Sequence, residues 1–311
     1  MNNISAFGLL LLFIYFSMVP SYAQKKNDLE GRCDLDIEFQ GKIQPAWLEI
    51  RHSGHDTFIG RFVFAFGSAR PISEIKIYGN RFTFQIPRQW EPDGSDMILH
   101  GQLKDNAISG TILYTDGSII HFNGKPAPQF PHIENPQWGK TIALFNGQNV
   151  EGWYFDSDDS HWSVSNGILT NVKGGANLIS KEKFTDFKIE AEFRYPKGSN
   201  SGIYLRGRYE VQIADNFGLE ASDIYFGGIY GFLEPNENVA RPAGEWQQYG
   251  ITLIGNRVTI VANGKTIIEN QTIPGITGGA LDSAEGKPGP IMIQGDHGPI
   301  EFKKFELTPI N

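Results

Sequence analysis

"NSGIYLRGRYEVQIAD" (residues 200–215) alternates apolar and polar side chains with a period of two, which is typical of a β-hairpin. Its apolar residues are Ile203, Leu205, Tyr209, Val211 and Ile213. Successive strand side chains point to opposite faces, so the other face carries Tyr204, Arg206, Glu210 and Gln212. We therefore predict two paired strands with one core-forming face and one face rich in strong hydrogen-bonding groups.

The same alternation continues along most of the chain, and no long stretch shows the 3.6-residue spacing of a helix. Glycine (36 residues) and proline (17 residues) separate short apolar runs, as in all-β sandwiches and barrels. A first series, residues 27–124, predicts a small antiparallel β barrel or sandwich domain. Its expected strands are 34–39, 47–52, 57–66, 72–78, 81–86, 97–103, 107–114 and 118–122.

Residues 125–139 contain Pro126, Pro128, Pro131 and Pro136 and show no strand pattern, so we expect a semi-rigid linker there. A second β series, residues 140–311, follows it. Its expected strands are 162–164, 187–195, 201–206, 209–214, 247–254, 257–262, 266–269, 291–294 and 301–307. The sequence thus predicts two β domains joined by a proline-rich segment.

Composition narrows the range of partners. The 311 residues carry a formal net charge of −8 and contain no basic run. Such a chain is poorly suited to nucleic acid or to an anionic membrane surface. The hydrophobic fraction of 40% is sufficient for ordinary globular cores.

The beginning of the chain resembles an export signal. An apolar run from Ala6 to Val19 precedes Ser21-Tyr22-Ala23, a small-x-small cleavage pattern. We expect residues 1–23 to be a signal peptide, which leaves no membrane span after cleavage and a periplasmic or extracellular protein. The single cysteine of the sequence, Cys33, then lies beyond the cleavage point and is expected to be a small core side chain.

Other polar residues extend the pattern of the hairpin. Alternation in Phe187–Tyr195 places Glu192 and Arg194 opposite the apolar set, and Gln294 ends another strand just before Asp296 and His297. If these strands are neighbours in one sheet, all of these groups share one face with Arg206, Glu210 and Gln212. The simpler alternative is a solvated face with cross-strand ion pairs of about 0.2–1 kcal/mol each. A planar Arg beside a carboxylate and an amide favours a fixed hydrogen-bonding site instead.

Several short segments of the second series together resemble one family, the 3-keto-disaccharide hydrolase or 3-keto-glucoside-1,2-lyase domain, also known as domain of unknown function 1080. In order, they are Leu144-Phe145-Asn146-Gly147, Gly152-Trp153, Trp162–Leu169, Phe184–Phe187, Asn200–Ile203, Tyr209–Ile213, Gly228-Ile229-Tyr230, Gly244-Glu245-Trp246, Asn263-Gly264 and Ile293–Gly298. The resemblance implies a concanavalin-like jelly-roll sandwich with a site on its concave sheet. It also implies substrates that are glycosides oxidised to a ketone at C3.

A 3-ketone acidifies the C2 proton, so that one base can remove it while the C1 substituent leaves. The product is a 2-hydroxy-glucal, to which water then adds. This chemistry needs a base, an acid for the leaving oxygen and a donor for the enolate. We expect Glu210, His297 and Arg206 to be catalytic, with the base left open between Glu210 and His297. Residues expected to bind substrate are Gln212, Gln294, Asp215, Glu192, Tyr204 and Asp296.

Two other functions stay open. A conventional two-carboxylate glycoside hydrolase would use the Glu210–Asp215 strand, but Gln212 stands where a middle acid is usual and Asp215 is one methylene shorter than Glu. A non-catalytic glycan-binding module is the other alternative, since this fold also hosts lectins and Tyr204 offers a stacking surface. A divalent metal ion could supply the electrophile, although the sequence has no compact His/carboxylate ligand spacing.

Overall fold

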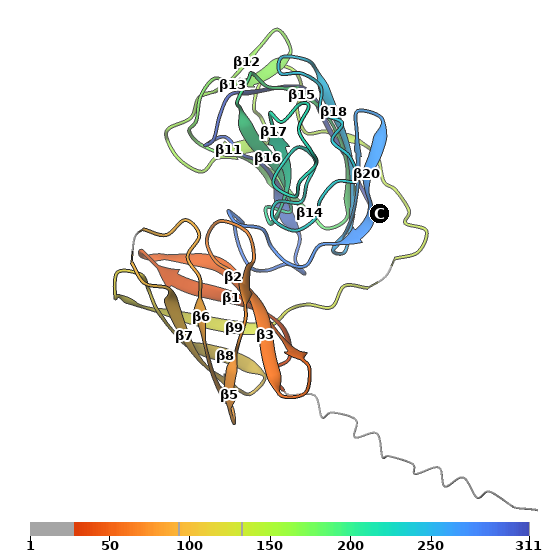
Figure 1. Ribbon diagram of the computed structural model, residues 1–311. Coiled ribbons are helices and arrows are strands. Elements are labelled where there is room, and N and C mark those ends of the chain that lie inside the picture. The colour runs from red at the N-terminus through yellow and green to blue at the C-terminus, as the bar shows by residue number, and fades with distance from the viewer. Residues whose placement is uncertain (1–27, 93, 132, 311) are drawn as a thin grey trace, which may run out of the picture.

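The computed structural model describes residues 28–92, 94–131 and 133–310 (Figure 1). Every helix-or-strand element in these residues is a β-strand, and the strands form three sheets. The predicted all-β class is confirmed. Residues 1–23, expected to be an export signal, lie outside the described residues, so that prediction stays untested. Within the described part, no helix has the length and apolar character that a membrane span needs.

The N-terminal unit is a nine-stranded antiparallel sheet in the order β4-β3-β2-β1-β9-β8-β7-β6-β5. The sheet curls so that β4 approaches β6, and it encloses a core that includes Leu35, Phe62 and Leu99. Its strands are β1 (Gly31–Phe39), β2 (Lys42–Ser53), β3 (Thr57–Val63), β4 (Arg70–Ile72), β5 (Lys76–Tyr78), β6 (Arg81–Ile86), β7 (Met97–Lys104), β8 (Ala107–Leu113) and β9 (Ile119–Pro126).

One expected strand of this unit is wrong. The stretch 72–78 forms two short strands, β4 and β5, with a break between them. Ile72 and Ile75 are both buried, although residues three apart on one strand point to opposite faces. The chain must therefore turn between them to place both side chains in the core.

The C-terminal unit is a sandwich of two antiparallel sheets, which confirms the predicted jelly-roll architecture. The larger sheet has the order β12-β13-β22-β15-β18-β19-β20 with β10 beside β22, and the smaller sheet has the order β11-β14-β21-β16-β17. Its strands are β10 (Ile142–Ala143), β11 (Trp153–Phe155), β12 (Trp162–Ser165), β13 (Ile168–Asn171), β14 (Leu178–Phe184), β15 (Phe187–Arg194), β16 (Asn200–Leu205), β17 (Tyr209–Ala214), β18 (Gln247–Ile254), β19 (Arg257–Ala262), β20 (Lys265–Thr272), β21 (Gly289–Ile293) and β22 (Ile300–Pro309).

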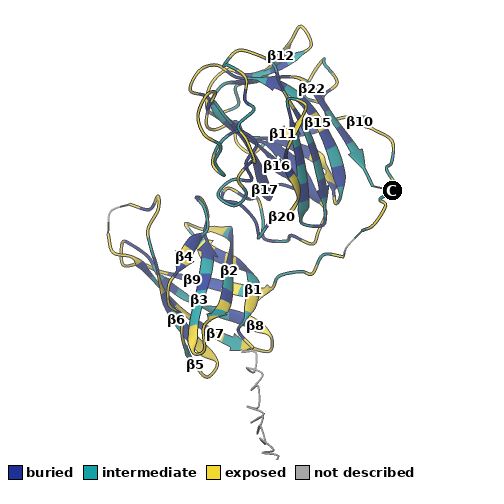
Figure 2. Ribbon diagram, turned by 45° about the vertical axis from the view of Figure 1, so that its right-hand side comes forward, coloured by how far each residue is buried: buried dark blue, intermediate teal, exposed yellow. Residues whose placement is uncertain are grey.

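Burial follows the predicted alternation. In β15 the residues Phe187, Ile189, Ala191 and Phe193 are buried between the sheets. Figure 2 shows that buried residues concentrate on the strands of both units. Strand β14 was not predicted, because a register shift between Ile179 and Lys183 interrupts its pattern.

The two units are joined by a packed interface. The loop between β20 and β21 reaches the N-terminal unit, where the Trp47 indole Nε1 donates to Ile276 O at 2.9 Å. Trp47 belongs to the core of the C-terminal unit although it lies on β2. Figure 1 shows the blue segments of this region beside the orange strands of the N-terminal unit.

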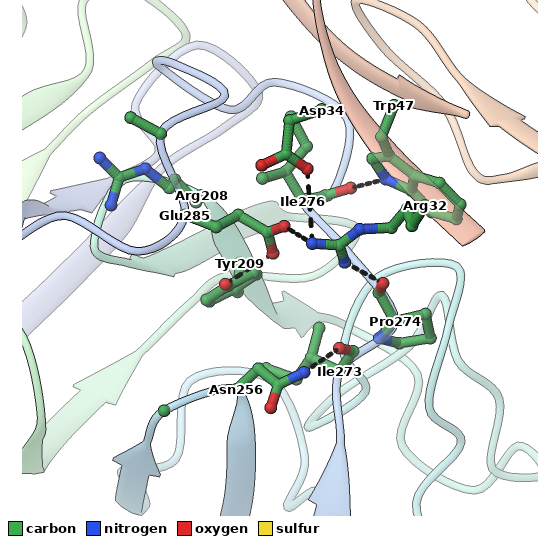
Figure 3. Close-up of polar contacts among 12 residues, drawn as sticks. Arg32, Asp34, Trp47, Arg208, Tyr209, Asn256, Ile273, Pro274, Ile276 and Glu285 are labelled. Carbon is green, nitrogen blue, oxygen red and sulfur yellow. Dashed lines mark hydrogen bonds and ion pairs between the residues drawn. The ribbon is translucent and has the colours of Figure 1, made fainter. Parts of the chain in front are cut away.

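An arginine is the electrostatic centre of this interface (Figure 3). The Arg32 guanidinium donates to Pro274 O and to the Glu285 carboxylate, and one of its nitrogens lies 3.4 Å from Asp34 Oδ1. The Tyr209 hydroxyl donates to the other Glu285 oxygen at 2.7 Å. Burial, and then the nearby Glu285 charge, raise the pKa of Asp34 from 3.8 to about 7. Arg32 is thus the cation that offsets the buried charge of Glu285.

The first prediction concerns this arginine. Arg32→Ala leaves the Glu285 carboxylate buried without its cation, so the free energy of unfolding should fall by about 3–5 kcal/mol at neutral pH. Urea denaturation of the variant and the wild type measures the loss. Arg81→Ala, which removes an exposed arginine from β6 of the same unit, is the control and should cost little. A loss equal to that of the control would contradict the role assigned to Arg32.

Candidate functional site

A cavity of about 520 Å³ opens between the two units, on the outer face of the smaller sheet of the sandwich. This volume is in the range that ligand pockets occupy. The C-terminal unit supplies the floor, and the N-terminal unit supplies one wall. The lining residues of the C-terminal unit are Asn200, Tyr204, Glu210, Gln212, Tyr230, Gly278, Gly279, Gln294, Asp296 and His297. Those of the N-terminal unit are Phe66, Gly67 and Trp90.

Strand register brings the predicted residues of the hairpin together. In the β16–β17 pair, Tyr204 lies opposite Glu210 and Gly202 lies opposite Gln212. Strand β21 pairs with β16 on the other side, and Gln294 follows directly after it. Tyr204, Glu210, Gln212 and Gln294 therefore share one face and line the same cavity, as the alternation predicted.

Glu210 is almost completely buried at the floor of this cavity, with 4% of its surface exposed. The carboxyl fits beside Gly202, because a Cβ at that glycine would lie 2.4 Å from Glu210 Oε1. Burial raises the pKa of Glu210 from 4.5 to about 8, against the opposing effects of Tyr204 and His297. Glu210 is therefore a neutral acid over most of the physiological pH range.

The contacts of Tyr204 also accommodate a neutral Glu210. The Tyr204 Oη lies 2.9 Å from Glu210 Oε2 and 3.0 Å from the Gly278 carbonyl oxygen. A phenol has one proton, so Tyr204 can donate to only one of these two oxygens. If Glu210 is protonated, it donates to Tyr204 while Tyr204 donates to Gly278, and both contacts become hydrogen bonds.

His297 and Asp296 form a second pair at the rim. His297 Nδ1 lies 2.6 Å from Asp296 Oδ1, and both side chains are half exposed. This hydrogen bond raises the pKa of His297 above its ordinary 6.5, although partial burial acts the other way. Asp296 holds the Nδ1 proton, which leaves Nε2 of the neutral ring free to accept a proton. His297 therefore has the form of an oriented base.

The turn Gly295–Gly298, which carries this pair, is held in place by hydrogen bonds to two asparagine side chains. The Asn171 amide, at the end of β13, donates to Gly295 O at 2.9 Å and to Gly298 O at 3.2 Å. Asn177 Oδ1 accepts from Gly295 N at 2.8 Å. These bonds hold the turn on either side of His297, so its position is built into the sandwich.

Three buried amide oxygens of the cavity lack a hydrogen-bond partner among the described protein atoms: Asn200 Oδ1, Gln212 Oε1 and Gln294 Oε1. A buried acceptor without a donor costs about 1–3 kcal/mol. All three belong to residues that line the cavity, so a ligand rich in hydroxyl groups would satisfy them.

Sequence reasoning missed three aromatic residues of the site. Tyr230 is held by a hydrogen bond from its backbone N to Glu210 O at 3.1 Å, and burial followed by Glu210 raises the pKa of its phenol. The segment Gly228-Ile229-Tyr230 was a visible signal for it. Phe66 and Trp90 come from the other unit, and nothing in their own sequence context connects them to the hairpin.

The prediction that Arg206 shares the cavity face is wrong. Arg206 follows directly after β16 with φ of 56°, in the left-handed region, so the alternation of the strand stops before it. Its guanidinium is buried at the opposite side, where it donates to Gly255 O and to the Tyr209 hydroxyl and lies 5.5 Å from the Phe130 ring. Arg206 therefore fixes the packing of residue 130 on the sandwich and does not line the cavity.

The predicted positions of Glu192 and Arg194 on this face are also wrong, and Asp215, expected to bind substrate, does not line the cavity. Strand β15 belongs to the larger sheet, where Glu192 pairs with Lys303 and Arg194 pairs with Glu301. Asp215 lies just beyond β17, and its carboxylate accepts from Gly198 N at 2.8 Å. Alternation assigns a face within a strand but does not tell which sheet contains the strand.

Among the described residues, no three or more His, Cys, Asp and Glu side chains are grouped so that they could hold a metal ion.

Comparison with known proteins gives matches to the second unit. A family model described as the 3-keto-alpha-glucoside-1,2-lyase-like domain matches residues 140–308. The 3-keto-disaccharide hydrolase of Bacteroides thetaiotaomicron is 25% identical over 167 aligned residues, and the alignment covers 41% of this chain and 57% of that protein. The chain thus spans little more than half the length of this curated relative.

Two solved structures from Parabacteroides distasonis ATCC 8503, each titled "putative glycosyl hydrolase", are also similar. One is 25% identical with a TM-score of 0.45 and covers 58% of this chain and 93% of its own. The other is 19% identical with a TM-score of 0.47 and covers 55% of this chain and 94% of its own.

The second prediction tests the neutral state of Glu210. A folded-state pKa of about 8, above the unfolded value near 4.5, means that the folded protein binds this proton more tightly. The stabilising contribution is complete below about pH 4.5, decreases as the pH rises and is lost above about pH 8. Glu210→Gln removes this dependence. Between pH 5 and pH 9 the free energy of unfolding of the variant should therefore fall less than that of the wild type, by a difference on the order of 3 kcal/mol or more.

Urea denaturation at the two pH values measures the difference. Glu192→Gln is the matched control, because it neutralises a partly exposed carboxylate on the other sheet and should behave as the wild type does. Identical pH dependence in wild type and Glu210→Gln would show that Glu210 is ionised when buried.

Proposed function

The chain belongs to the 3-keto-alpha-glucoside-1,2-lyase-like domain family, whose model matches residues 140–308, and from this premise we propose that it is an enzyme that cleaves 3-keto-glycosides. One observation carries the proposal. The buried carboxyl of Glu210 and the imidazole of His297, which Asp296 orients, line the same cavity. Elimination across C1–C2 of a 3-keto-glycoside needs one acid and one base.

In the first step, His297 Nε2 removes the proton from C2, and the electrons form the enolate of the C3 ketone. The C1–O bond then breaks, the C1–C2 double bond forms, and Glu210 gives its proton to the leaving oxygen. The products are a 2-hydroxy-glucal that keeps the ketone and the free alcohol. In this proposal Tyr230 and the Gln294 amide, which both line the cavity, donate to the enolate oxygen.

Water addition reverses the roles of the two groups. The Glu210 carboxylate takes a proton from the water that attacks C1, and the His297 imidazolium returns its proton to C2. The sum is hydrolysis of the glycosidic bond, with both residues back in their starting states. Gln212 and Asn200 hold the sugar hydroxyls through their buried amide oxygens.

A conventional two-carboxylate mechanism is less well supported by the site. Such enzymes place a second carboxylate about 5–5.5 Å or about 6.5–9.5 Å from the acid. Asp296 is the other carboxyl group that lines the cavity among the described residues, and it is engaged at 2.6 Å by His297. A catalytic base that is a histidine suits a C2 proton acidified by a ketone.

The third prediction is the activity itself. The purified protein should convert a 3-keto-glucoside to the ultraviolet-absorbing glucal or to 3-keto-glucose, and it should leave the unoxidised parent glucoside intact. An enzyme-coupled assay of the released alcohol measures cleavage of the 3-keto-glucoside and of the parent glucoside. Comparable cleavage of the parent would favour a plain glycosidase, whereas sugar binding without turnover of either compound would favour a lectin.

The fourth prediction assigns the two groups through pH profiles. With 3-keto-glucosides, kcat/KM should be bell-shaped, with an acid limb from His297 and a basic limb near pH 8 from Glu210. Asp296→Asn removes the bond that raises the pKa of His297, so the acid limb should move to lower pH.

The leaving group separates the acid from the base. A 4-nitrophenyl leaving group needs no protonation, so Glu210→Gln should keep most of its activity on that substrate and lose the basic limb. The same variant should lose about 100-fold or more on an alkyl leaving group, as is usual for a missing general acid. His297→Ala should lose activity on both. An equal loss on both leaving groups in Glu210→Gln would reverse the assignment.

A further inference from the structure

One wall of the cavity is aromatic and comes from the N-terminal unit, outside the part of the chain that matches the family. Trp90 and Phe66 line the cavity and are 67% and 39% exposed. The floor, by contrast, presents amide and carboxyl groups. A large exposed aromatic surface beside a polar floor is a feature of a ligand site rather than of a free protein surface.

Trp90 is held in place although most of its surface is exposed. The neighbouring Glu91 forms a fully buried ion pair with Arg70, and its other oxygen accepts from Gln89 N at 2.9 Å. Gln89 Nε2 also donates to Ser68 Oγ at 3.1 Å. A buried ion pair fixes the local geometry because a partner that moves away leaves a charge in an apolar region. The backbone on both sides of Trp90 is therefore anchored.

The indole rests against a glycine at the interface. A Cβ at Gly67 would lie 2.9 Å from Trp90 Cδ1, and a Cβ at Gly278 would lie 2.6 Å from the Gly67 backbone. Gly279 N donates to Ala65 O at 2.9 Å. The Gly278 carbonyl is also the acceptor of Tyr204, which contacts Glu210. A short chain of contacts, from Trp90 through Gly67, Gly278 and Tyr204, thus fixes the position of the aromatic wall relative to Glu210.

We propose that Trp90, with Phe66 beside it, forms the subsite for the leaving sugar ring of a 3-keto disaccharide. This rests on the function proposed above, and it assigns the subsite to the N-terminal unit, outside the part of the chain that matches the family. A pyranose has hydroxyl groups at its edge and C–H bonds on its faces. The keto ring is held at its edge by the polar floor, and the second ring places an apolar face on the indole.

The fifth prediction compares two leaving groups. Trp90→Ala should raise KM for a 3-keto-glucosyl-glucose disaccharide about tenfold, the effect of losing about 1.4 kcal/mol of apolar contact. For methyl 3-keto-glucoside, which has no second ring, kcat and KM should stay within about twofold. Tyr78→Ala is the matched control, because Tyr78 is an equally exposed aromatic of the same unit that does not line the cavity.

The outcomes separate this proposal from the activity. An equal change on both substrates, or no change on the disaccharide, overturns the leaving-group subsite while the cleavage reaction stands. If no 3-keto-glycoside is cleaved, calorimetric titration with the unoxidised disaccharide decides the subsite alone. Binding that is about tenfold weaker in Trp90→Ala supports the subsite, and equal affinity or no binding by the wild type overturns it.

Discussion

The site depends on one constraint, the burial of the Glu210 carboxyl against the Tyr204 hydroxyl. A charged carboxylate at this depth is strongly disfavoured, so the carboxyl keeps its proton and becomes a donor. The Tyr204 hydroxyl then donates to the Gly278 carbonyl oxygen. Gly278 lies in the loop that contacts the N-terminal unit. A continuous chain of contacts therefore joins Glu210, through Tyr204 and Gly278, to the N-terminal unit.

Much of this site could be predicted from the sequence, because its floor is a regular hairpin. Strand β17 has the predicted bounds, and its period of two places Glu210 and Gln212 on one face. The same rule failed for Arg206, where a positive φ ends the strand, and for Glu192, which alternates correctly but lies in the other sheet. Sheet membership is decided by long-range pairing, which a local pattern does not contain.

The contribution of the N-terminal unit to the cavity is even harder to predict from local sequence patterns. Its strands follow from alternation and turn residues, but its contribution to the cavity depends on how it packs on the sandwich. That packing uses Trp47, a β2 residue that belongs to the core of the other unit, and Arg32, whose hydrogen-bond acceptors Pro274 and Glu285 lie more than 200 positions away. Neither residue differs in sequence context from an ordinary strand side chain, so only the structure reveals that the wall of the site is remote from its floor.

The strand order of the N-terminal unit has a further consequence. Its first strand, β1, pairs with its last, β9, so the chain enters and leaves this unit through adjacent strands. Neighbouring ends are usual for a unit that is inserted or replaced as a whole, although here Trp47 and Arg32 also anchor this unit to the sandwich. Phe66, Gly67 and Trp90 come from this unit, whereas the residues proposed to react and the buried amides of the cavity all lie in residues 200–297. Sequence changes in the N-terminal unit would therefore alter one wall of the cavity without changing the residues proposed to react.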